Sequence, residues 1–265
     1  MSLCMRLAVL MLSACLTSSS FAGFKVLMSP PRMELKLVPG EAITKVIKVR
    51  NDFPTRARIR SRSRDWYHDT EGKVHYQRPG DVERSAADWI LVNPREFEIP
   101  PYETYSVRLT ASLPEEAEGT YWTSLSFETI PESSAGQIGM STRARLICYI
   151  YLTCIGTERE RAELTDFTSE EVNGETIVKV TVKNTGNVHL RPDGKVSVEH
   201  DGQSPVVQEF QIRDLVVLPY SSRTYAFNAG PLSGLCETRA VMDYGDVVFA
   251  ERIFVAGAPR KLANE

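Results

Sequence analysis

The residues of this chain that could ligate a metal or act as catalytic nucleophiles are few and widely separated. None of the four histidines lies at metal-ligand spacing from another histidine or from a cysteine. The sequence also has no CxxC, HExxH or GxSxG motif and no phosphate-binding glycine loop. We therefore expect no metal, no cofactor and no enzymatic activity, which leaves binding as the chemistry open to this chain. The histidines are His68, His75, His189 and His200.

Five cysteines could form disulfide bonds, but Cys4 and Cys15 lie close to the N-terminus, in the segment that reads as a leader. Cys148 and Cys154 belong to one strand-like run, in which their Cα atoms would be about 20 Å apart, too far for a disulfide. A bridge would therefore need Cys236 as one partner. The alternative is that all three are buried, small apolar side chains.

A run of alternating arginines is the most pronounced charge feature. On a β-strand its parity places five guanidinium groups on one face, opposite Ala57, Ile59, Ser61 and Ser63. One interpretation is a contact surface for an anionic, carboxylate-rich partner. The other is a solvated outer face balanced by acidic residues on adjoining strands. The net charge of −3 gives no indication of nucleic-acid binding. The arginines are Arg56, Arg58, Arg60, Arg62 and Arg64.

Short β-strands are predicted to position these side chains. Apolar residues alternate with polar ones at 33–37, 105–111 and 121–127, among other segments. A period of two with many β-branched and aromatic residues is typical of half-buried strands. The run 144–155 is apolar on both parities, which predicts a strand covered on both faces or a central strand running toward a domain junction.

The length and the breaks in this alternation predict two domains. Two β-sandwiches of about 100 residues each, together with a leader, would account for the chain. The polar stretch at 157–161 marks the linker, and alternation restarts after it. We expect an all-β protein with two immunoglobulin-like β-sandwich domains after an N-terminal signal peptide. The expected boundaries are a signal peptide at 1–22, an N-terminal domain at 23–156, a C-terminal domain at 157–256 and a disordered tail at 257–265.

The N-terminal segment predicts export. Arg6 is its only charge, an apolar core follows it, and small residues at Ser20 and Ala22 fit cleavage after Ala22. The apolar core is too short for a permanent membrane helix. Residues 12–15 (Leu-Ser-Ala-Cys) also resemble a lipoprotein box, so the alternative is a protein anchored through a lipid on Cys15. We expect a periplasmic protein that associates with a membrane only if Cys15 is lipidated.

Several short motifs, taken in their order along the chain, resemble the first domain of the periplasmic pilus chaperones of the chaperone–usher pathway, the PapD-like chaperones. The resemblance covers residues 24 to about 154, and beyond it only a generic immunoglobulin-like second domain is seen, which those chaperones also have. The motifs are Ser29-Pro30-Pro31-Arg32-Met33-Glu34-Leu35, Asn51-Asp52, Tyr121-Trp122, Phe127-Glu128-Thr129-Ile130-Pro131 and Arg143-Ala144-Arg145-Leu146.

The resemblance implies a chaperone that binds and caps fimbrial or related surface-fibre subunits by β-strand addition. In that family, a strand near the end of the first domain lends alternating apolar side chains to an incomplete subunit. Ile138 and Met140 fall on two of these donor-strand positions, and Gly136 falls on the third. Arg32 and Arg145 fall on the two basic positions that hold the subunit's C-terminal carboxylate, although the family usually has lysine at the second. The implied partners are pilin-like subunits and an outer-membrane usher.

A second function remains open from the sequence. The chain could be an exported or lipid-anchored two-domain surface or envelope protein that binds a partner without chaperone activity. A mature N-terminus at Gly23 would favour the chaperone, whereas a lipid on Cys15 would favour the anchored protein.

Overall fold

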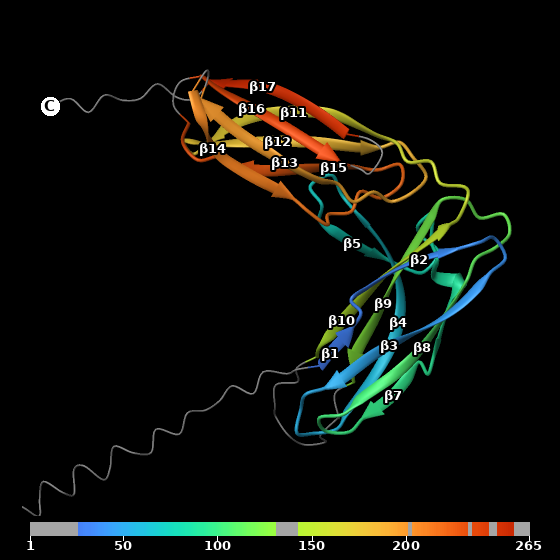
Figure 1. Ribbon diagram of the computed structural model, residues 1–265. Helices are drawn as coiled ribbons and strands as arrows, with labels where there is room; N and C mark the ends of the chain where they lie inside the picture. The colour runs from blue at the N-terminus through green and yellow to red at the C-terminus, as the bar shows by residue number, and fades with distance from the viewer. Residues whose placement is uncertain (1–25, 131–142, 201–202, 233–234, 244–247, 257–265) are drawn as a thin grey trace, which may run out of the picture.

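Two β-sandwich domains follow one another along the chain and meet at an angle (Figure 1). The structure is a computed structural model that describes residues 26–130, 143–200, 203–232, 235–243 and 248–256. Within these ranges the only helical element is the 3-10 turn η1 (Ala87–Trp89), and the expected all-β fold of two immunoglobulin-like sandwiches is confirmed. No helix in the described part of the chain is long and apolar enough to span a membrane.

The first domain packs two sheets face to face around one apolar core. Alternation builds this core, because every second side chain of a strand points inward. In β2, for example, Met33, Leu35 and Leu37 are buried and the residues between them are exposed. One sheet has the order β1 (Val26–Ser29), β3 (Ala42–Asn51), β8 (Thr104–Ser112) and β6 (Ile90–Asn93). The other has the order β2 (Arg32–Leu37), β10 (Arg145–Cys154), β9 (Thr120–Thr129), β4 (Ala57–His68) and β5 (Val74–Gln77), and β7 (Glu96–Ile99) also pairs with β4.

The second domain repeats the arrangement with a core of its own. Val178, Val180 and Val182 of its central strand β12 are buried at alternate positions. One sheet has the order β11 (Ala162–Val172), β12 (Glu175–Asn184) and β15 (Ser222–Asn228). The other has the order β14 (Gln203–Ile212), β13 (Asp193–His200), β16 (Leu235–Asp243) and β17 (Val248–Ala256).

The apolar run at 144–155 is strand β10, which lies between β9 and β2. Cys148, Ile150 and Leu152 point into the core of the first domain. The residues of the other parity, Tyr149 and Tyr151, pack in a separate cluster at the junction with the second domain. Both faces of the strand are therefore covered, as the sequence predicts, and each face belongs to a different cluster.

None of the three cysteines of the described residues is in a disulfide bond. Cys148 and Cys154 are buried in the first core and Cys236 in the second, so the interpretation as small buried side chains is confirmed. Burial raises the pKa of the Cys148 thiol to about 12. This thiol is consequently unreactive in the folded protein.

Several predictions fall on residues outside the described ranges. These are the signal peptide at 1–22 with Cys15, the donor-strand positions Gly136, Ile138 and Met140, and the tail at 257–265. The boundary between the domains lies between β10, which ends at Cys154, and β11, which begins at Ala162.

Candidate functional site

The two domains meet in an apolar cluster rich in aromatic side chains. Trp66, Trp122 and Tyr151 of the first domain are buried against Val216 and Leu218 of the second. The indole N–H of Trp122 donates to the carbonyl of Trp66 at 2.7 Å, so its polar atom is satisfied in this buried setting. Desolvated aromatic surface of this kind holds the domains together.

Two backbone hydrogen-bond donors of the second domain also bond to the first domain beside this apolar cluster. The backbone N–H of Leu218 donates to Nε2 of His68 at 3.3 Å, and the N–H of Thr224 donates to the carbonyl of Thr70 at 2.6 Å. Burial lowers the pKa of His68. The neutral imidazole can accept this bond, whereas a protonated ring could not. Both acceptors lie in the β4–β5 hairpin, which reaches toward the second domain (Figure 1).

Four charged residues form a network across the same junction. Nη1 of Arg32 donates to both carboxylate oxygens of Asp214, at 2.6 and 2.8 Å. Nε of Arg191 donates to Glu34 at 2.7 Å, and Nε of Arg32 lies 3.2 Å from the same oxygen. His189 and Arg191 lower the pKa of Glu34 to about 2; Arg191 makes the close contact, whereas His189 Nε2 is 3.7 Å away.

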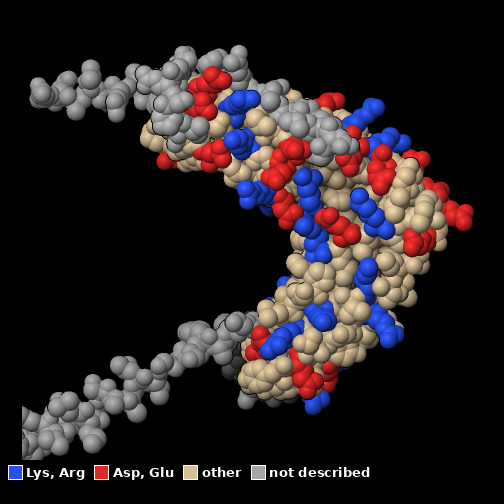
Figure 2. All heavy atoms as spheres, in the orientation of Figure 1, with Lys and Arg blue, Asp and Glu red and all other residues tan. Residues whose placement is uncertain are grey.

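Beside this network, a pocket of about 320 Å³ opens between the domains. Basic and acidic side chains are intermixed on the concave side of the molecule (Figure 2). The floor of the pocket is aromatic, since Trp66 contacts Tyr149 edge-to-face with 4.8 Å between the ring centres. The pocket is lined by Pro31, Arg32, Trp66, His68, Gly72, Val74, Tyr149 and Tyr151 of the first domain and by Arg191, Asp214, Leu215, Val216 and Arg223 of the second.

The structure does not bring the two predicted basic residues together. Arg32 is in register with Tyr149 of β10, four residues beyond Arg145. At about 3.3 Å per residue, Arg145 lies about 13 Å away along the strand. Its partner is Glu128 of β9, with 2.9 Å between Nε and Oε1. The guanidinium that does lie near Arg32 is that of Arg191 in the second domain, since both contact Glu34 and Asp214. No motif or spacing in the sequence signals Arg191.

One side of β10 is an open edge over residues 145–148. β9 pairs with β10 from Arg145 to Thr153, whereas β2 pairs with it only from Tyr149 onward. The N–H of Tyr149 donates to the carbonyl of Pro31, so residues of the same parity direct their backbone groups to this side. Arg145 and Ile147 therefore present N–H and C=O groups that no strand of the described residues pairs. The open edge ends where β2 begins, at Arg32.

The alternating arginines of β4, with Arg56 just before the strand, lie on the outer face of their sheet, opposite the inward-facing Ala57 and Ile59. Three of them pair with acidic side chains of the adjoining strand β7: Arg58 and Arg60 contact Glu96, and Arg56 contacts Glu98. The interpretation as a balanced, solvated face is thus confirmed for these three.

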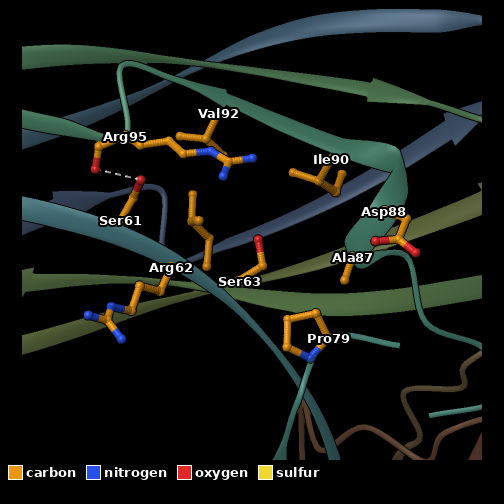
Figure 3. A pocket seen from close by; sticks show the side chains of 10 residues that line it. Ser61, Arg62, Ser63, Pro79, Ala87, Asp88, Ile90, Val92 and Arg95 are labelled. Carbon is orange, nitrogen blue, oxygen red and sulfur yellow. Dashed lines mark hydrogen bonds between the residues drawn. The ribbon is translucent and has the colours of Figure 1, made fainter. Parts of the chain in front are cut away.

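A second pocket, of about 420 Å³, lies in the first domain between β4 and β6 (Figure 3). Arg62 points away from its centre, and the hydroxyl of Ser61 already donates to the carbonyl of Arg95 at 3.0 Å. No group of histidine, cysteine or acidic residues in the described ranges could hold a metal ion. The cleft between the domains is therefore the candidate site.

No protein-family model matches this sequence, and no curated protein matches it. Solved structures similar to it include the class 5 fimbriae chaperone CfaA, with 12% identity, a TM-score of 0.47 and coverage of 89% of this chain and 100% of that chain. Another is a CsuC–CsuE chaperone–tip adhesion subunit complex of Acinetobacter baumannii, with 15% identity, a TM-score of 0.47 and coverage of 86% and 97%. A third is the Salmonella enterica SafA pilin–SafB chaperone complex, with 13% identity, a TM-score of 0.44 and coverage of 87% and 97%. Fimbrial chaperones thus recur among the structures similar to this chain, and at these identities the likeness concerns the fold alone.

Proposed function

We propose that this chain is a periplasmic chaperone that binds and caps fimbrial or related surface-fibre subunits by β-strand addition. The observation that carries the proposal is the open edge of β10, where the backbone groups of Arg145 and Ile147 pair with no strand among the described residues, and which ends at Arg32. A subunit that lacks a strand exposes an apolar groove with unpaired backbone groups, and such an edge can pair with it. The expected partners are pilin-like subunits, with an outer-membrane usher as the recipient.

The position of Arg32 sets the direction of the added strand. β2 occupies the side of β10 from Tyr149 onward, so a strand added to the open edge must stop there. The guanidinium of Arg32 lies at this point and favours the end of the added strand that carries a negative charge, which is the C-terminal carboxylate. The added strand then runs parallel to β10, as β2 does. Arg32 is the residue that supports the carboxylate grip, and Arg145 flanks the other end of the added strand.

The segment that precedes β10 keeps its proposed role as the donor strand. Ile138 and Met140 share a parity, so on a strand that continues β10 they would point to one face. Aspartate at either position should abolish subunit capture, because a charge would enter the apolar groove of the subunit. Unchanged capture by Ile138→Asp and Met140→Asp would rule out these two residues as donors.

Substitutions at Ile147 test the open edge. Ile147→Pro removes an N–H that points to this edge and spares the bonds to β9, while Ile147→Ala removes the side chain and keeps the N–H. We expect the proline variant to lose co-purification with a fibre subunit encoded by a neighbouring gene, and the alanine variant to keep most of it. Equal capture by both folded variants would contradict strand addition at this edge. Binding to an envelope component without any subunit capture would favour the surface-protein alternative.

A further inference from the structure

The pocket between the domains adjoins the point where the open edge ends. Arg32 and Tyr149, the register pair at which β2 takes over the side of β10, both line it. A strand that ends at Arg32 therefore brings its last residue to the mouth of this pocket. At about 320 Å³ the pocket is within the size range of sites that hold small organic groups.

The floor and one wall of the pocket suit an apolar or aromatic side chain. Trp66 is buried beneath it and contacts the rings of Tyr149 and Tyr151 edge-to-face. The phenol of Tyr149 is hydrogen-bonded to that of Tyr76 at 2.8 Å, so its polar atom already has a partner. Val74 adds an aliphatic surface from β5. Aromatic pairs of this geometry favour a further ring packed at their edge or face.

The charges around the pocket favour one carboxylate. Arg32, Arg191 and Arg223 line it together with Asp214, and Glu34 beside the pocket pairs with Arg32 and Arg191, which leaves an excess of one positive charge. Nη1 of Arg223 donates to the carbonyl of Val216 at 2.8 Å, which leaves its charge uncompensated by that bond. Nη2 of Arg191 is buried and has no hydrogen-bond partner in the described residues. A ligand with one negative charge complements this excess, whereas a basic ligand would be repelled.

The carboxylate of an external ligand could replace that of Asp214 as the partner of Arg32. Its side chain is 62% exposed and belongs to the loop between β14 and β15. Exposed ion pairs of this kind contribute little to stability. Exchange of Asp214 for an external carboxylate therefore needs no change in the core of either domain.

We infer that this pocket binds the C-terminal residue of the captured subunit, with an apolar or aromatic side chain on the Trp66–Tyr149–Tyr151 floor and its carboxylate on Arg32. The inference rests on the proposed function, because strand addition at the open edge delivers the C-terminus to Arg32. It adds a selection rule: subunits that end in a large apolar residue bind more tightly than subunits that end in a small or basic one.

Synthetic ligands can test the pocket in the full-length exported chain. The probes are acetylated heptapeptides of alternating valine and threonine that end in phenylalanine, alanine or phenylalanine amide, together with N-acetylphenylalanine, which cannot form a strand. Replacing the terminal phenylalanine with alanine should weaken binding about tenfold or more, because an aromatic side chain is no longer removed from water. Amidation should weaken binding about tenfold or more by removing the charge that Arg32 holds.

A pocket-filling variant and a matched control localise the effect. Val74→Phe should bring the phenylalanine peptide down to the affinity of the alanine peptide, whereas Val46→Phe, at an exposed valine of β3 in the other sheet, should change neither. Equal affinities of the phenylalanine and alanine peptides in the unmodified protein, both dependent on Arg32, would overturn the pocket and leave strand addition standing. Suppose that N-acetylphenylalanine binds, that Val74→Phe abolishes this binding, and that Ile147→Pro weakens the binding of none of the probes. This result would support the pocket and contradict strand addition. No binding of any phenylalanine probe would overturn the inference.

Discussion

Arg32 in the first domain donates hydrogen bonds to both carboxylate oxygens of Asp214 in the second, at 2.6 and 2.8 Å. The guanidinium of Arg32, which we propose binds the C-terminal carboxylate of a subunit, is thus already paired with the carboxylate of Asp214 within the protein. The two side chains are 38% and 62% exposed, so the pair is accessible to a competing ligand. Asp214 is therefore expected to act as an internal competitor for Arg32.

Asp214→Ala should raise the affinity for the phenylalanine heptapeptide by up to about fivefold, since the energy of one exposed ion pair no longer opposes binding. Isothermal titration calorimetry measures the change. Glu209→Ala is the matched control, because it removes an exposed ion pair with Lys195 on the sheet formed by β13 and β14. A weaker affinity in Asp214→Ala would mean that Asp214 positions Arg32 for the ligand.

The two predicted basic residues should contribute unequally to subunit binding. Arg32→Ala should cost about 2–5 kcal/mol of binding free energy, the range for truncating one partner of a desolvated charge pair. Arg145→Ala should cost less than about 1 kcal/mol, because Arg145 is half exposed and paired with Glu128. Binding curves with one subunit compare the variants directly. A larger loss in Arg145→Ala would place the carboxylate at the start of β10.

The network at Glu34 predicts a contribution to stability that acid removes. Contacts with His189 and Arg191 lower the pKa of this carboxyl to about 2 in the folded protein, against 4.5 as its ordinary value. A lowered pKa means that the stabilisation is fully present above about pH 5 and disappears as the pH falls toward 2. With the side chain 40% exposed, solvent screening reduces the effect to about 1 kcal/mol.

Urea unfolding as a function of pH compares Glu34→Gln with the unmodified protein. The difference in unfolding free energy should be largest at neutral pH and should vanish near pH 2. Glu170→Gln, which removes an exposed ion pair with Lys179 in the second domain, serves as the control. A difference that is constant from pH 7 to pH 2 would exclude the ionised carboxylate as its source.

The cysteines should resist modification while the protein is folded. Cys148, Cys154 and Cys236 are buried and form no disulfide bond within the described residues, and burial raises the pKa of Cys148 to about 12. We expect no alkylation by iodoacetamide at pH 8 in native buffer and alkylation of all three in denaturant without reductant. Mass spectrometry distinguishes the outcomes, and a pair of cysteines that alkylates only after reduction would show a disulfide.

The period of two in the sequence was sufficient to predict the strands, their inward faces and the all-β class. That pattern is local, because the backbone geometry of a strand alone places Met33, Leu35 and Leu37 on one face. The same reasoning placed the arginines of β4 on the outer face. It could not show that Glu96 and Glu98 lie beside them, because the pairing of β4 with β7 is a contact between separate strands.

Tertiary structure alone decided the composition of the site. Arg32 and Asp214 are 182 residues apart, and Glu34 and Arg191 are 157 apart, so no spacing rule connects them. Strand register likewise decided that Tyr149 rather than Arg145 lies beside Arg32. The open edge depends on where β2 begins against β10, which is a property of the pairing and not of either segment. The sequence by itself determined which side chains face inward along each strand, and the packing of the two domains decided which of the remaining charges meet.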